Sequence, residues 1–462
     1  MNAPRTIEGQ WRIFGSRSRA YIGTLNYDPN DGLELVVNFA HNRGLAGVFR
    51  GMAHRRRRCP HTIHGLDANG CPVTLFGCSV VESNLSAGFE KYTIRPLAAI
   101  LGDHFDTWAR AACSTVDVRY SLLDNWLFRP VTTIDQTPDG GLAYHPQHHP
   151  DLVVPLAGGA CLTITHSKSF NESVQMVEIR QQHFIRFSFP HPISLKAAND
   201  NYVSPFRNFF TLLTNSKVFV DSVKFSREHQ NPDLTPLELL VSNHNVEKAD
   251  RETLSPHMLV PYADIATQLA QIIPAWFVYY RDMESIISLY FAAIWSNGIP
   301  DTTQFLLLAQ ALEAYHSRCN LFSSSIQSTA SFRSRVGRIL EHIESRDEKR
   351  WLKEKLQHAN QKTLAQRLKD LMSRNDADLA RFIRKPTDFR NKIRNTRNYY
   401  THFDETLRRS GKIATGRELA VITFKMRALL LIFFLRDLRL PQTAIDRVVN
   451  RMRSISVVSL DA

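Results

Sequence analysis

Residues 385–403 read KPTDFRNKIRNTRNYYTHF, and this stretch predicts the helix around which the second half of the chain is organised. Pro386 suits the first turn of a helix, where its missing N–H costs nothing. Thr387 and Asp388 place oxygen acceptors and a negative charge beside the free amides of that turn. We expect one helix over residues 387–409. Its apolar stripe recurs at intervals of three, four and seven residues and comprises Phe389, Ile393, Tyr400, Phe403 and Leu407.

A second stripe on the same helix is polar. Its members are three or four residues apart and share one face, namely Asn391, Arg394, Asn398, His402 and Glu405. Arg397 lies on its flank and offers a planar fork to phosphate oxygens. A histidine titrates near neutrality and can act as acid or base. The same pattern suits a solvated face with a structural histidine, so spacing alone leaves a catalytic and a structural role open.

The spacing Arg-x4-His is weak evidence by itself, because a basic chain of this length should contain roughly one or two by chance. Residues 56–61 and 186–191 also fit it, but Pro60 and Pro190 interrupt those segments. Residues 397–402 differ, because an asparagine follows the arginine and the segment lies within a predicted continuous helix.

The segment Arg397-Asn398-x-x-x-His402, late in a helical region, resembles the RNxxxH motif of HEPN ribonucleases. The chain around it resembles the Abi-like HEPN proteins of the ApeA type, which are bacterial anti-phage effectors. Residues 305–316 (FLLLAQALEAYH) resemble the helix that opens the HEPN domain of this family. Residues 65–76 (GLDANGCPVTLF) and 122–127 (LLDNWL) resemble its amino-terminal domain, so the resemblance extends over nearly the whole chain.

Arg397 and His402 are five residues apart, which is about 140° around a helix and roughly 7.5 Å along it. One helix does not easily aim both side chains at one phosphate. Two copies packed around a twofold axis can place both pairs around one cleft. The resemblance implies such a composite site, and with it a homodimer or a higher homo-oligomer.

The resemblance also implies a metal-independent endoribonuclease that acts in anti-phage, abortive-infection defence. The 2′-OH of the RNA attacks the adjacent phosphorus and leaves 2′,3′-cyclic phosphate and 5′-OH ends. In this chemistry His402 transfers a proton, Arg397 neutralises charge on the phosphoryl oxygens, and Asn398 holds His402 or the phosphate. We expect no cofactor and no metal, because the sequence shows neither a carboxylate cluster nor a glycine-rich phosphate loop.

Further residues are candidates for RNA binding around the motif. Arg390 and Arg394 can contact phosphates, and Tyr399 is expected to be exposed and to stack on a base, whereas Tyr400 is expected in the core. Glu313 and His316 lie on a predicted helix over residues 302–318. They either support the site or form an ordinary surface pair at helical spacing.

The charge of the chain fits a polyanionic partner. Its 462 residues carry a formal net charge of +13 and have a pI near 9.5. Many basic proteins bind no nucleic acid, so charge alone does not decide the partner. Together with the resemblance it favours RNA, with tRNA as one candidate.

The pattern of elements predicts an α+β protein. Short β-branched and aromatic segments separated by turns predict an antiparallel, sandwich-like β-rich domain over residues 1–255. The family resemblance marks this domain as a sensor or partner-binding module, with a phage-derived trigger as one candidate partner. Residues 256–282, with three prolines, read as a linker, and residues 283–462 as an all-α HEPN bundle. Within the first part, residues 137–150 read as a solvated loop that carries His145, His148 and His149.

Targeting and metal signals are weak. The polar start has no apolar run, the run over residues 428–435 is too short to cross a membrane, and the six cysteines show no pairing rhythm, so we expect a reduced, cytoplasmic protein. Cys59, His61, His64 and Cys71 match no common structural zinc pattern. Whether they bind zinc stays open, and the arginine run 55–58 is better explained as an exposed basic loop.

Two alternatives to the nuclease remain. Some HEPN domains only bind nucleic acid or dimerise, so the chain could be an RNA-binding or sensor scaffold, or an RNA-binding adaptor unrelated to defence.

Some HEPN toxins have a tyrosine two residues after the motif histidine, which a partner enzyme modifies. This chain has Asp404 at that position, so that mode of control is not supported.

Overall fold

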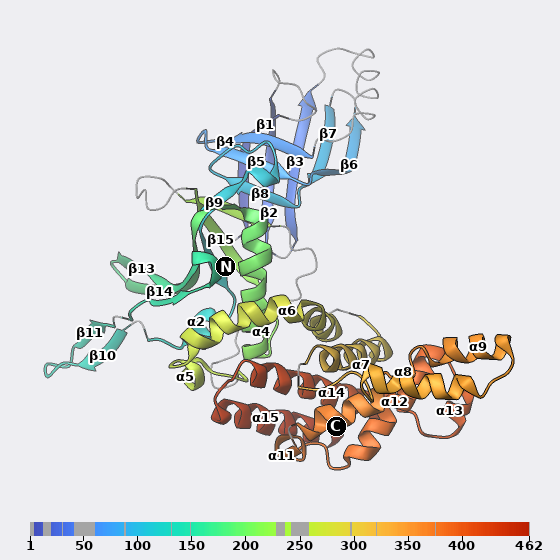
Figure 1. Cartoon of the computed structure of the whole chain (residues 1–462). Coiled ribbons are helices and arrows are strands. Elements are labelled where there is room, and N and C mark those ends of the chain that lie inside the picture. Colours follow the sequence, from blue (N-terminus) through green and yellow to red (C-terminus); the bar gives the residue numbers. More distant parts are fainter. Residues whose placement is uncertain are drawn as a thin grey trace. The chain divides into compact units, whose positions relative to one another are not determined.

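The computed structural model describes residues 4–12, 20–29, 31–40, 61–86, 89–130, 132–147, 149–227, 236–241, 258–295, 298–319, 321–374 and 376–461. The chain divides into two compact units, residues 1–274 and 275–462 (Figure 1). The first consists mainly of antiparallel strands and the second of helices. The predicted α+β class, a β-rich part followed by a helical part, is therefore confirmed.

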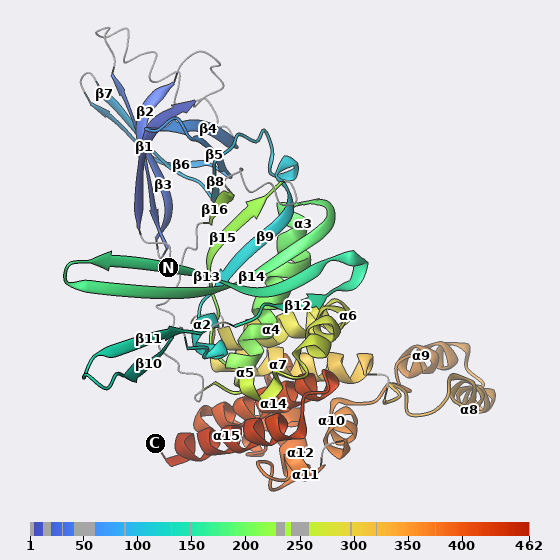
Figure 2. The ribbon, with the colours of Figure 1, turned by 90° about the vertical axis from the view of Figure 1, so that its left-hand side faces the viewer.

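Fourteen strands of the first unit form one antiparallel sheet in the order β12-β13-β14-β9-β15-β16-β8-β5-β4-β1-β2-β3-β7-β6. They are β1 (Arg5–Arg12), β2 (Tyr21–Asp28), β3 (Gly32–Ala40), β4 (Thr62–Asp67), β5 (Pro72–Phe76), β6 (Ser79–Ser86), β7 (Phe89–Arg95), β8 (Ala98–Leu101), β9 (Ala112–Tyr120), β12 (Leu152–Pro155), β13 (Cys161–Ser173), β14 (Met176–Ser194), β15 (Val220–Ser226) and β16 (Leu237–Val241). The hairpin of β13 and β14 is long (Figure 2).

A separate ribbon pairs β10 (Thr132–Gln136) with β11 (Leu142–Pro146). The expectation of a loop over residues 137–150 is therefore wrong for residues 142–146. His145 lies in β11, and its Nε2 is 3.4 Å from the carboxylate of Asp135 on β10. The ring of His149 contacts the carbonyl of Pro130 at 2.8 Å, and His148 lies outside the described residues.

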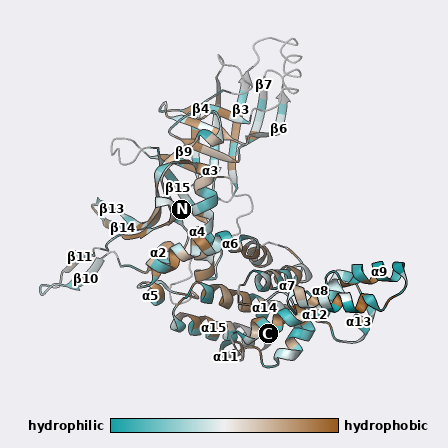
Figure 3. Ribbon diagram, viewed as in Figure 1, coloured by the Kyte–Doolittle hydropathy of each residue, from teal (hydrophilic) through white to brown (hydrophobic). Residues whose placement is uncertain are grey.

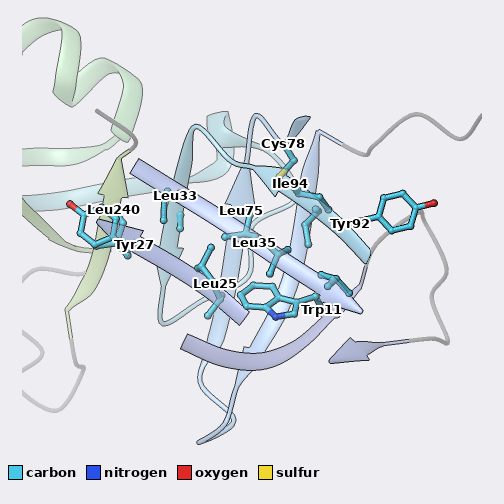
Figure 4. Packing of buried hydrophobic residues seen from close by; sticks show 14 residues of the cluster. Trp11, Leu25, Tyr27, Leu33, Leu35, Leu75, Cys78, Tyr92, Ile94 and Leu240 are labelled. Atoms are coloured by element: carbon cyan, nitrogen blue, oxygen red, sulfur yellow. The ribbon is translucent and has the colours of Figure 1, made fainter. Parts of the chain in front are cut away.

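The half of the large sheet from β16 to β6 coils around its own core (Figure 4). Leu240 of β16 and Leu35 of β3 are well separated in strand order, yet both belong to one buried cluster, which requires strong coiling of the sheet. Trp11 is fully buried there and its Nε1 donates to the carbonyl of Gly23 at 3.0 Å. Gly65 lets the indole pack on β4, because a Cβ at this position would lie 2.3 Å from the Trp11 ring.

The other half of the sheet is covered by α2 (Leu123–Leu127), α3 (Leu195–Ala198) and α4 (Ser204–Thr214). The Phe206 ring of α4 lies 5.4 Å from the ring of Tyr120 on β9. Asp124 of α2 accepts hydrogen bonds from the backbone N–H and the Nδ1 of His183 on β14, both at 2.8 Å. This contact explains why an aspartate stands in the segment 122–127, since it fastens α2 to the sheet.

The helices that follow are α5 (Tyr262–Ile265), α6 (Leu269–Trp295), α7 (Asp301–Arg318), α8 (Thr329–Glu341), α9 (Arg346–Leu356), α10 (Leu364–Ser373), α11 (Asp376–Leu379), α12 (Pro386–His402), α13 (Glu405–Arg409), α14 (Gly416–Asp437) and α15 (Gln442–Asp461). The segment 256–282, expected as a linker, thus contains α5 and the first half of α6. The helix predicted over residues 302–318 is confirmed as α7.

Helix α14 is the centre of the helical unit. Its apolar run over residues 428–435 is buried, with every side chain at most 1% exposed, so this run belongs to the core of the unit. By contrast, α8 and α9 bury no residue, and α9 carries mostly hydrophilic residues (Figure 3). Within the described residues, no helix is both long enough and apolar enough to cross a membrane.

Candidate active site

Helix α12 carries the candidate motif and is held by a buried face of mixed chemistry. The buried side chains are Phe389, Ile393, Asn395, Thr396 and Tyr399. The helix packs against α7 and α10. The hydroxyl of fully buried Thr396 accepts a hydrogen bond from the backbone N–H of Ala414 at 2.8 Å. This bond ties the chain before α14 to the turn of α12 that contains the motif.

The end of α12 corrects the predicted apolar stripe. The helix stops at His402, and Phe403 caps it in the left-handed region with φ 52°, so the expected helix over residues 387–409 is interrupted. Phe403 is consequently 70% exposed and Tyr399 only 9%. The expectation of an exposed Tyr399 and a core Tyr400 was wrong, because Tyr399 continues the line of Ile393 and Thr396 into the bundle, while Tyr400 is half-buried.

Phe403 is the aromatic residue that sequence reasoning missed. It directly follows the motif histidine and presents a large apolar ring to solvent. Its left-handed backbone is unusual for a residue with a bulky side chain, since glycine or asparagine commonly takes this capping position. Such strain concentrates at functional sites. The residue that stands where a base could stack is therefore Phe403, and Tyr399 is unsuited to that role in this protomer.

Arg397 points toward α7, where it meets Glu313. Its Nη2 lies 3.6 Å from the Glu313 carboxylate, and the two side chains are 36% and 28% exposed. The backbone carbonyl of Glu313 in turn accepts from Arg367 of α10 at 3.1 Å. The structure thus brings together two of the residues singled out by the sequence, and it places the guanidinium at the surface with one carboxylate beside it.

His316 has a different environment from Glu313, although both lie on α7. It is fully buried, and its Nε2 is 2.9 Å from the carboxylate of Asp370, which also accepts from Lys362 at 2.6 Å. Burial lowers the pKa of His316 although Asp370 opposes this. Burial raises the pKa of Asp370, but the hydrogen bonds from Lys362 and His316 outweigh this effect, so the pKa is lowered. His316 is therefore neither a surface residue nor part of the solvent-facing site.

His402 is the last residue of α12 and is exposed, whereas Asn398, one turn earlier, is half-buried. Neither side chain hydrogen-bonds to another residue that the structure describes, so both are available to a ligand. Asp404 follows closely and caps α13, and hydrogen bonds from Thr406 lower the pKa of this carboxyl, with a smaller contribution from His402. A carboxyl group therefore lies two residues after the motif histidine.

Arg390 and Arg394 are bound mainly by their own helix. Arg390 donates to the carbonyl of Pro386 at 3.4 Å and to the hydroxyl of Thr387 at 3.1 Å. Arg394 donates through Nε and Nη2 to the side-chain oxygen of Asn395 at 3.1 and 3.0 Å. Neither arginine is neutralised by a carboxylate in the part of the chain that the structure describes. Both therefore present guanidinium groups without a paired carboxylate along the helix that carries the motif.

The zinc candidate does not form a recognisable site. Cys59 and the run 54–58 lie outside the described residues. His64 contacts the carbonyl of Phe105 at 2.9 Å and stacks on His104 at 4.8 Å between ring centroids. The described residues contain no group of three or more side chains that could hold a metal ion.

Two protein-family models match the chain. The model for ApeA N-terminal domain 1 matches residues 6–276, and the model for Apea-like HEPN matches residues 306–444, which include all of α12. No curated protein and no solved structure matches significantly. The two matches confirm the resemblance that was based on the RNxxxH segment and on the upstream stretches.

Proposed function

Since the chain belongs to the ApeA family, whose members join an ApeA N-terminal domain to a HEPN domain, we propose that it is an anti-phage effector that acts as a metal-independent endoribonuclease. The observation that supports cleavage is the arrangement of α12. Arg397 and His402 both reach solvent, and Asn398 has no side-chain partner among the described residues. A phosphate binder, a polar positioner and a proton carrier are thereby available on one helix.

One protomer provides only half of the required groups. Cleavage by the 2′-OH forms a bond from the 2′-oxygen to phosphorus and breaks the bond from phosphorus to the 5′-oxygen. One group takes the proton of the 2′-OH and another gives a proton to the leaving 5′-oxygen. HEPN domains commonly act as dimers on RNA. In a composite site His402 of each copy supplies one of these two roles.

Arg397 acts on the phosphate in this mechanism. Charge builds on the non-bridging oxygens as the 2′-oxygen attacks, and a guanidinium placed there stabilises that charge. The Glu313 carboxylate lies 3.6 Å from Nη2 of Arg397. We assign Glu313 as a positioning residue. Asn398 completes the set by hydrogen-bonding to the phosphate or to His402.

RNA binding draws on the helix around the motif. Arg390 and Arg394 contribute charge along the backbone of the RNA, and exposed Phe403 replaces Tyr399 as the residue that stacks on a base. In the same proposal, the N-terminal unit binds a phage-derived trigger, and RNA such as tRNA is cut only after that event.

The test is to incubate the full chain with total bacterial RNA in EDTA and to map the ends produced. Three proteins are compared, namely the wild type, His402→Ala, and His342→Ala as a control at an exposed histidine that caps α8. We expect cyclic-phosphate ends from the wild type and the control, and none from His402→Ala. The assay is repeated with lysate of phage-infected cells to supply a trigger. Equal RNA patterns for wild type and His402→Ala under both conditions would refute the nuclease proposal.

The alternative, a scaffold that binds RNA without cutting it, is distinguished by the same variants. RNA affinity retained by the wild type, with no cleavage in either condition, would support the scaffold. Cleavage lost in Arg397→Ala and His402→Ala, with affinity maintained, would support the enzyme.

A further inference from the structure

A second cationic site lies at the other end of α12 from the motif. It is a cavity of about 590 Å³ lined by residues of the segment 381–392 and of α14 and α15. Six basic and two acidic side chains line it. Along α12, Lys385 lies about 18 Å from Arg397, and Lys392, the lining residue nearest to the motif, lies about 7.5 Å from it at 1.5 Å per residue. Arg397, Asn398 and His402 do not line the cavity, so it is distinct from the candidate active site.

The charges of this cavity are only partly neutralised. Lys392 pairs with Glu418 at 2.9 Å. Arg384, Lys385 and Lys425, in contrast, form no ion pair with any residue that the structure describes. Asp388 and Glu418 also line the cavity, but the six basic side chains outnumber them, so the lining carries a net positive charge. Exposed cations such as Arg384 and Lys385 are commonly solvated, whereas a partly buried lysine such as Lys425 is usually paired.

Lys425 is the informative member of the set. It is half-buried on α14 and lines the cavity together with apolar side chains such as Ile422 and Phe382. Burial, and in addition the neighbouring charge of Arg384, lower the pKa of Lys425. The protein therefore holds a positive charge in a place where that charge is unfavourable in the absence of an anion.

The backbone adds to this preference. Lys385 precedes α12 and forms no capping hydrogen bond with its side chain, and Pro386 occupies the first helical position. The amino-terminal end of a helix attracts negative charge. Asp388 already lies in this first turn and lines the cavity, so the helix terminus acts beside one carboxylate and three basic side chains that form no ion pair with a described residue.

We propose that this cavity binds a phosphate group. The phosphate belongs either to the backbone of a bound RNA or to a free nucleotide or polyphosphate, and the chemistry of recognition is the same for both. Lysine and arginine donate charge-assisted hydrogen bonds to phosphate oxygens. The site goes beyond the proposed function, because its occupancy does not require that the RNxxxH motif cleaves RNA.

The test uses the full chain and Lys425→Met, with Lys355→Met as a control of equal charge change on exposed α9, outside the cavity. The first probe is pyrophosphate, measured by thermal shift. The second is a fluorescent 2′-O-methyl RNA 12-mer, which cannot be cut by 2′-OH attack, measured by anisotropy at several salt concentrations. A failure of cleavage is thus distinguishable from a failure of binding.

We expect Lys425→Met to bind at least one of the two probes at least tenfold more weakly than the wild type. Lys355→Met should bind both probes with unchanged affinity. If the RNA backbone supplies the phosphate, the salt dependence of RNA binding also falls by about 0.7 in the log–log slope, the value for one single-strand contact. Loss for pyrophosphate alone identifies a free phosphate ligand. Unchanged affinity for both probes overturns the proposal.

The stability of Lys425→Met provides an independent check. If Lys425 stabilises the fold, its replacement should lower the melting temperature. If Lys425 is instead a partly buried cation whose partner is a bound ligand, its replacement should leave the melting temperature of the free protein equal or higher. A clear fall without ligand would contradict the argument from charge crowding. In that case Arg384→Gln, at an exposed position of the same cavity, carries the binding test.

Discussion

The hydrogen bond between Thr396 and Ala414 gives the sharpest test of how the motif is positioned. Both residues are fully buried, and the hydroxyl of Thr396 accepts the backbone N–H of Ala414 at 2.8 Å. Thr396→Val keeps the shape of the side chain but leaves that N–H without an acceptor. An unsatisfied buried donor costs about 1–3 kcal/mol.

The matched control is Thr423→Val on α14. Its hydroxyl donates to the carbonyl of Leu419 at 2.7 Å. That carbonyl lies four residues earlier in the same helix, so it keeps its helical backbone partner when the hydroxyl is removed. The same chemical change should cost clearly less there, because no backbone group is left unsatisfied.

Hydrogen exchange is the appropriate assay, because a chain of two units need not unfold in one step. We expect amides of residues 393–399 and 413–416 to exchange about 5- to 150-fold faster in Thr396→Val, which corresponds to about 1–3 kcal/mol. Thr423→Val should change the same peptides less. Equal effects of the two variants would refute the view that the bond to Ala414 fixes the motif-bearing turn.

Three further outcomes follow from the site. Glu313→Gln should lower the cleavage rate at saturating RNA about tenfold. The RNA affinity measured by anisotropy should stay equal or rise, because the variant removes a carboxylate beside Arg397. Weaker RNA binding at an unchanged cleavage rate would contradict a positioning role. Phe403→Gly should stabilise the end of α12 by about 1 kcal/mol, measured by hydrogen exchange, since glycine adopts the left-handed region without strain. The same variant should weaken RNA binding by about 1–3 kcal/mol, because the stacking ring is lost. Tighter RNA binding would exclude the stacking role. The folded-state pKa values of His316 and Asp370 are both lowered, so their contributions to stability should be present at neutral pH and decline as the pH falls, below about 6.5 for His316 and below about 4 for Asp370. In a pH series of thermal unfolding, Asp370→Asn should therefore remove the decline that belongs to the carboxylate. A wild-type chain that gained stability as the pH fell over that range would contradict the assignment.

The sequence predicted the positions of α7 and α12 well because their signals are local. Pro300 and Asp301 mark the start of α7, and Pro386 lies at the first position of α12. For Glu313 the sequence left a supporting role and an ordinary surface pair open, and in the structure its carboxylate lies 3.6 Å from Nη2 of Arg397. What failed was the choice of buried face. Tyr399 and Tyr400 differ by only about 100° of rotation, and the stripe was extended through Phe403 on the assumption of a continuous helix.

That assumption failed for a physical reason that no local rule conveys. The helix ends because Phe403 adopts a left-handed backbone, and the usual signal for such an end is glycine or asparagine. Asp404 caps the helix that follows, and a capping aspartate directly after Phe403 is the local signal that could have indicated the end of α12. The burial of His316 could not be inferred either, because its partner Asp370 lies on α10, far away in sequence.

The two cationic sites of α12 differ in how their charge is balanced, and this difference bears on how activity could be restrained. Arg397 has Glu313 beside it, so an incoming phosphate must displace or share an existing partner. Lys425 and Arg384 form no ion pair with any residue that the structure describes, so an anion at the cavity displaces no partner of these two side chains. If the phosphate bound at the cavity belongs to RNA, the RNA therefore binds there first, with less competition than at Arg397. The motif engages the phosphate only when further contacts compensate for the loss of Glu313, and a second copy of α12, with its own arginine and histidine, supplies such contacts.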